Sequence, residues 1–152
     1  MTREPIYAAV FAFFAALTIG GSPAFLTATR KLATWEDVEP EAQPALLMRQ
    51  VSENANYRKG LPTIWTCQIV LLLYVKTQAQ NVPDVVPSVV LNPLLDAIEA
   101  AVIGGMDDPS SLSATLGGLV SHCAIKGDVQ YFEGTLGDDA VVAVPIEFLT
   151  SP

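Results

Sequence analysis

The sequence has few of the residues that carry enzymatic or metal chemistry. It contains one histidine, His122, and two cysteines, Cys67 and Cys123, among 152 residues. One histidine excludes a polyhistidine metal site within a chain, and two cysteines are too few for a disulfide-rich scaffold. His122 and Cys123 are neighbours on an expected strand, where successive side chains point to opposite faces, so they form no nucleophile pair without special geometry. We expect neither enzymatic activity nor a cofactor.

Positive charge is also scarce. Eight Lys and Arg face sixteen Asp and Glu, for a net charge of −8. Wrapping phosphate needs clustered positive charge, so we expect no specific nucleic-acid binding. The imbalance is confined to one part of the chain, because residues 1–90 carry seven charges of each sign, whereas residues 91–152 carry nine acidic residues and only Lys126. This acidic part either keeps the protein soluble or repels or orients an anionic neighbour.

The longest apolar run, residues 6–19, is shorter than the about 20 residues that span a membrane. Glu4 and Pro5 before it are typical of a helix start, and Gly20 is a suitable helix end. Apolar residues recur at helical spacing at Ile6, Val10, Phe13, Phe14 and Leu17. Arg3 before the run and small residues at 20–24 after it are also typical of a signal peptide. The residues alone leave both interpretations open.

The remainder predicts strands around a second helix. The expected strands are residues 25–32, 44–50, 63–76, 119–133 and 140–149. Residues 63–76 are apolar on both faces, which favours a central strand covered on both sides, and the polar residues 51–60 are expected to be a loop. Asn92 and Pro93 predict the start of a helix that ends at Gly104. We therefore expect one domain over residues 1–152, of the α+β class, in the order α-β-β-β-α-β-β. Its sheet is mixed, mainly antiparallel and of about five strands.

Two acidic pairs are the remaining candidates for chemistry. Asp107 with Asp108, and Asp138 with Asp139, could offer oxygen ligands to a cation. Neither pair has the spacing of a known calcium loop, so we interpret both as solvated turns and expect no metal site.

The element order resembles that of lambda-like phage tail terminator proteins, a family of minor tail or tail-completion proteins. Several stretches are also similar to small tail-assembly proteins: WEDV at 35–38 with EAQPAL at 41–46, LNPLLDAIEA at 91–100, TLGGLVSHC at 115–123, FEG at 132–134 and VPIE at 144–147. The similarity extends over nearly the whole chain and includes no catalytic motif. It favours retaining the first helix in the mature fold.

The resemblance implies a virion structural protein that forms a ring, expected to be a homo-hexamer, on a completed tail tube. Such a ring ends tube polymerisation and joins the tube to the head connector, with DNA passing through unbound. Its partners would be itself, the tail-tube protein and the connector, with no membrane, and it would assemble in the host cytoplasm into the virion neck. We expect contacts between copies at Tyr57, Arg58 and Lys59, and at Asp107, Asp108, Asp138 and Asp139. The alternative is a secreted periplasmic or envelope binding domain that loses residues 1–24.

Overall fold

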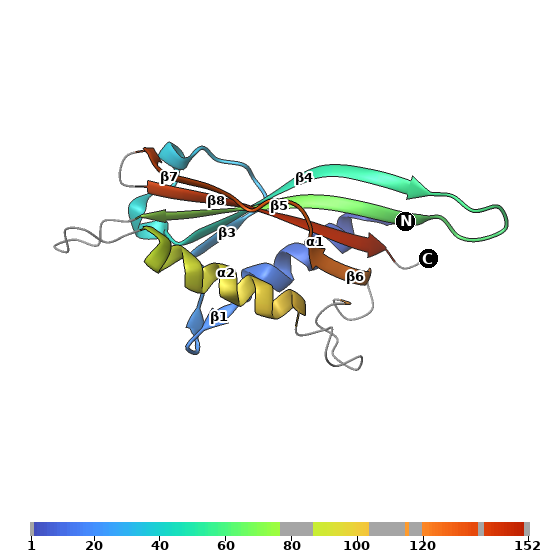
Figure 1. Ribbon diagram of the computed structural model, residues 1–152, viewed down its shortest axis with the longest axis horizontal. Helices are drawn as coiled ribbons and strands as arrows, with labels where there is room; N and C mark the ends of the chain where they lie inside the picture. Colours follow the sequence, from blue (N-terminus) through green and yellow to red (C-terminus); the bar gives the residue numbers. More distant parts are fainter. Residues whose placement is uncertain (1, 77–86, 104–114, 116–119, 137–138, 151–152) are drawn as a thin grey trace.

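The computed structural model describes residues 2–76, 87–103, 115, 120–136 and 139–150. These residues form a mixed sheet with two helices on one face (Figure 1), which confirms the α+β class. The elements are α1 (Arg3–Ala15), β1 (Thr18–Ile19), β2 (Ser22–Pro23), β3 (Thr27–Thr29), the 3-10 helices η1 (Trp35–Asp37) and η2 (Pro40–Ala42), β4 (Ala45–Asn56), β5 (Ile64–Lys76), α2 (Pro87–Ile103), β6 (Val120–Ile125), β7 (Gln130–Leu136) and β8 (Asp139–Thr150). None of the helices in these ranges is long and apolar enough to cross a membrane.

Helix α1 packs against the sheet through Tyr7, Val10 and Phe14, all of them buried. The ring of Tyr7 meets Phe148 of β8 edge-on, with the ring centroids 5.5 Å apart. The helix ends at Ala15, before the expected end at Gly20. Gly20 and its neighbour instead adopt positive φ in the turn between β1 and β2, a backbone conformation that glycine tolerates best.

The large sheet has the order β3-β4-β5-β8-β6, with β7 also paired to β8. β3 lies parallel to β4 at one edge, and the other pairs are antiparallel. The single strand expected at 119–133 is wrong, because two strands occupy it and pair with opposite halves of β8. Gly127 separates them with φ +119°, and a β-carbon there would come within 3.2 Å of Pro145.

Strand β4 is longer than predicted. Residues 51–56, expected as part of a loop, continue the pairing with β5 as far as Asn56, after a register shift between Gln50 and Ser52. β4 and β5 therefore form one long hairpin. Helix α2 is longer too: it begins at Pro87, and Pro93 lies inside it rather than in its first turn. The earlier start places Leu91 in the core together with Leu94.

The main core lies between the helices and the sheet, and a smaller one lies on the opposite face. In the smaller core, Leu47 and Tyr74 pack beneath Ala33 and Val38 of the segment that carries η1 and η2. The Tyr74 hydroxyl donates a hydrogen bond to the Ala33 carbonyl oxygen at 3.2 Å. β5 is thus covered on both faces only along its last residues. Nearer the start of β5, Gln68 is exposed. The expectation that both faces of this strand are covered therefore holds only for its C-terminal half.

Candidate interaction surface

The β4–β5 hairpin extends past both helices at one end of the molecule (Figure 1). Residues 57–63, here called the hairpin tip, connect the two strands. The Leu61 N–H donates a hydrogen bond to the Arg58 carbonyl oxygen at 3.1 Å, and Gly60 has φ +81°. This hydrogen bond closes a four-residue turn whose third position needs positive φ, which glycine adopts without strain. Arg58 and Lys59 are therefore presented in a defined turn.

The hairpin tip combines apolar and cationic side chains. Tyr57 and Leu61 are 73% and 59% exposed, and Arg58 and Lys59 are exposed beside them. Over the part of the chain that the structure describes, neither cation takes part in a salt bridge. A pocket of about 340 Å³ lies between the hairpin tip and the end of β8, and its lining includes Leu61, Ile64 and Leu149. Large exposed apolar groups next to unpaired cations are typical of a contact surface.

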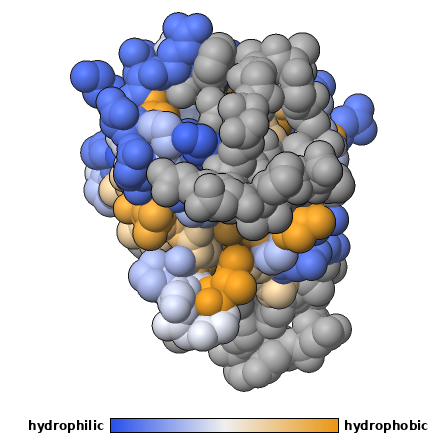
Figure 2. All heavy atoms as spheres, turned by 90° about the vertical axis from the view of Figure 1, so that its left-hand side faces the viewer, coloured by the Kyte–Doolittle hydropathy of each residue, from blue (hydrophilic) through white to orange (hydrophobic). Residues whose placement is uncertain are grey.

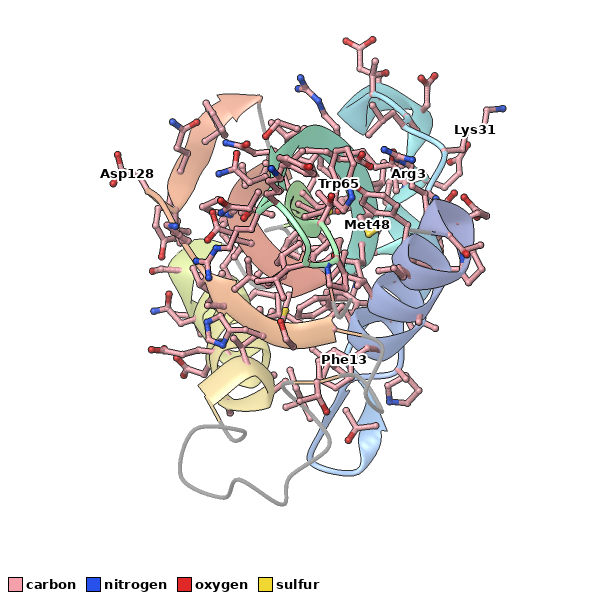
Figure 3. All side chains as sticks on the ribbon, turned by 90° about the vertical axis from the view of Figure 1, so that its right-hand side faces the viewer. Arg3, Phe13, Lys31, Met48, Trp65 and Asp128 are labelled. Carbon is pink, nitrogen blue, oxygen red and sulfur yellow. The ribbon has the colours of Figure 1, made fainter. Side chains whose placement is uncertain are left out.

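Three contacts between side chains hold the base of the hairpin to α1. Arg3 Nε lies 2.7 Å from Glu53 Oε2, and the Tyr7 hydroxyl donates to Glu53 Oε1 at 3.0 Å. The Arg3 guanidinium also stacks 4.9 Å from the ring centroid of Trp65 (Figure 3). The hydrogen bond to Glu53 raises the pKa of Arg3, and burial raises the pKa of Tyr7, so both groups keep their protons at neutral pH. These contacts orient the hairpin relative to α1.

The expected contact residues fall into three groups. Tyr57, Arg58 and Lys59 lie together at the hairpin tip. Asp107, Asp108 and Asp138 lie outside the described residues. Asp139 is the first residue of β8 and pairs with Lys76, the last residue of β5. The hairpin tip adjoins the other end of β5, so about 40 Å separate Asp139 from the tip at the usual rise per strand residue. The tip could meet Asp139 only in another copy of the chain.

A second surface was not foreseen from the sequence. A groove of about 500 Å³, here called the α2 groove, lies between α2 and strands β6 and β7. Its apolar lining includes Leu95 on the helix, with Ile125 and Tyr131 on the strands, and Asp96 and Glu99 of α2 contribute carboxylates. Its residues come from α2 and from the strands β6, β7 and β8, which follow that helix in the chain. In the sequence, only the i, i+3 spacing of the two acids could have indicated one side of the groove.

The end of the molecule opposite the hairpin also exposes hydrophobic groups between hydrophilic ones (Figure 2). Val89 at the start of α2 is 66% exposed, and Phe132 on β7 is 44% exposed. The chain thus has apolar surface at both ends of the sheet.

The two cysteines are poorly suited to chemistry. Both are buried and unpaired, and burial raises the pKa of each, to about 12 for Cys123. Phe148 of β8 pairs with Cys67 of β5 on one side and with Cys123 of β6 on the other. Two strand spacings separate them by about 9–10 Å, more than the roughly 7 Å that a disulfide can bridge. Their arrangement supports a structural role.

Metal-ligating residues do not gather within the described ranges, where no group of three or more His, Cys, Asp or Glu side chains could hold an ion. No protein-family model matches the chain, and no curated protein matches it.

Proposed function

We propose that this protein is the repeating subunit of a ring that caps a phage tail tube, ends its growth and joins it to the head connector. The observation that carries the proposal is the hairpin that projects past the helices and presents Tyr57, Arg58, Lys59 and Leu61 to solvent. A closed ring needs two different surfaces on each subunit, so that one surface of each copy meets the other surface of the next. A projecting arm supplies the first of these surfaces.

The charge distribution supports contacts between copies. The hairpin tip carries two unpaired cations, whereas Asp96, Glu99 and Asp128 are exposed on other elements. Surfaces of opposite sign on one chain favour head-to-tail association over stacking of like surfaces. The net charge of −8 is suited to a ring through which DNA passes, because the protein as a whole repels a polyanion. The hexameric stoichiometry follows the family resemblance.

The secreted alternative is supported by no feature of this surface. Loss of residues 1–24 would remove Tyr7, Val10 and Phe14 from the core, together with the contacts of Arg3 and Tyr7 at the hairpin base.

The proposal is tested by growing tail tubes from the tail-tube protein of the same genome and measuring tube lengths by electron microscopy. Substoichiometric amounts of this protein should lower the final mean tube length. The variant Lys59→Glu should lose most of this effect, whereas Lys31→Glu, the same charge reversal at an exposed position away from the hairpin, should retain it. Tubes that grow equally long with and without the wild-type protein would contradict the proposed function.

A further inference from the structure

We propose that the hairpin tip of one subunit docks in the α2 groove of a second copy of the chain. This inference rests on the proposed function, in that the ring is built from copies of this protein, and it names the partner surface. The groove forms because β6 ends at Ile125 and β7 begins at Gln130. The turn at Gly127 breaks the sheet edge beneath α2.

The groove has the size and lining of a docking site for a few large side chains. Its volume of about 500 Å³ lies within the roughly 300–1,000 Å³ of pockets that bury small ligands. Leu95, Val129 and Tyr131 give it an apolar lining, as a docked Tyr57 and Leu61 would require. Burying these two exposed side chains removes apolar surface from water on both copies.

The charge around the groove is complementary to that of the hairpin tip. Asp96 and Glu99 line it, Asp128 is exposed in the adjoining turn (Figure 3), and none of the described lining residues is basic. The nearby Lys126 is held by Glu147, with Nζ 2.6 Å from Oε1. The groove therefore offers carboxylates to the two cations that the tip leaves unpaired.

The contact can form only between copies. Both strands of the hairpin continue to the tip, and their pairing resumes after the register shift between Gln50 and Ser52. The tip projects away from α2 (Figure 1), so it cannot fold back into the groove of its own chain. The two surfaces share no residue. A contact between unlike surfaces repeats from copy to copy and closes into a ring when the rotation between neighbours permits.

Charge reversal across the contact tests the inference by sedimentation equilibrium of the full chain at low salt. The hairpin variant Arg58→Glu/Lys59→Glu and the groove variant Asp96→Lys/Glu99→Lys should each weaken self-association about tenfold or more. An equimolar mixture of the two variants should restore association, because each acidic tip then meets a basic groove and each basic tip an acidic groove. The matched control Glu36→Lys/Glu41→Lys reverses two exposed carboxylates elsewhere and should associate like the wild type.

The outcomes separate the inference from the proposed function. Loss of association in the hairpin variant, with a groove variant that behaves like the control, would overturn the groove as acceptor and leave the ring proposal standing. A wild-type chain that stays monomeric at every concentration would overturn the contact itself, and the tube-growth assay then decides the function separately. Tyr57→Ser tests the apolar contribution to the contact. It should weaken association even at 1 M salt, where the screening length is only about 3 Å and charge pairs contribute little.

Discussion

Replacing Phe14 by alanine should cost this protein a large part of its stability. The Phe14 side chain is fully buried in the main core, where its ring also meets that of Phe13 edge-on at 5.2 Å. A buried Phe→Ala change costs about 3–5 kcal/mol, because apolar contacts are lost and a cavity remains. Domains have unfolding free energies of about 5–15 kcal/mol, so the loss is a substantial fraction of the total. For a chain of this size it should lower Tm by roughly 6–20 °C.

The assay is urea unfolding followed by tryptophan fluorescence and circular dichroism. Phe13→Ala is the matched control, because it removes the same ring from the neighbouring, partly exposed position (Figure 3) and should cost about 1–2 kcal/mol. A loss of unfolding free energy in Phe14→Ala no larger than that in Phe13→Ala would contradict the full burial of Phe14. Costs well below about 1 kcal/mol for both variants would mean that α1 contributes little to the core, as the secreted alternative requires.

Two further predictions concern the thiols and one ion pair. Cys67 and Cys123 should react with a thiol reagent only in denaturant, because both thiols are buried and neither is in a disulfide. Two equivalents of reagent should then react per chain. Fast reaction of the folded protein would contradict the burial of these thiols. Hydrogen bonding from Lys126 lowers the pKa of Glu147 below its ordinary 4.5, so this carboxylate stabilises the fold above that pH and loses its contribution as pH falls through the lowered pKa. Glu147→Gln should therefore be about 1 kcal/mol less stable than wild type at pH 7. In urea titrations this difference should shrink as the pH falls below 4.5 and through the lowered pKa, and a difference independent of pH would refute the assignment.

The sequence predicted the fold best where periodicity and burial coincide. The α1 stripe contains Val10 and Phe14, and the alternating residues of β5 lie in the main core as expected. The end of β4 was missed because Ser52, Glu53 and Asn54 have low strand propensity. Their pairing with β5 overrides that preference. The predicted start of α2 was wrong because Pro93 was assigned to the first turn of the helix. A proline inside a helix is tolerated where the packing of its neighbours favours continuation.

Of the two candidate contact surfaces, the sequence indicated the hairpin tip and not the α2 groove. The turn at Gly60 and the polar, basic residues before it were readable as an exposed contact segment, although the strands that project it were not. The α2 groove could not be predicted, because it depends on how α2 packs against a sheet edge that breaks at Gly127, between β6 and β7. Local sequence specifies a turn, whereas a groove depends on tertiary packing.

Electron microscopy of tail tubes grown with gold-labelled protein tests directly whether the protein forms a ring on tube ends. If the protein caps tail tubes, label should lie only at tube ends, in a closed ring one subunit deep, and the ring should be lost when Arg58 and Lys59 are both replaced by glutamate. Label spread along the tubes, or tube ends that never carry label, would contradict the proposed function.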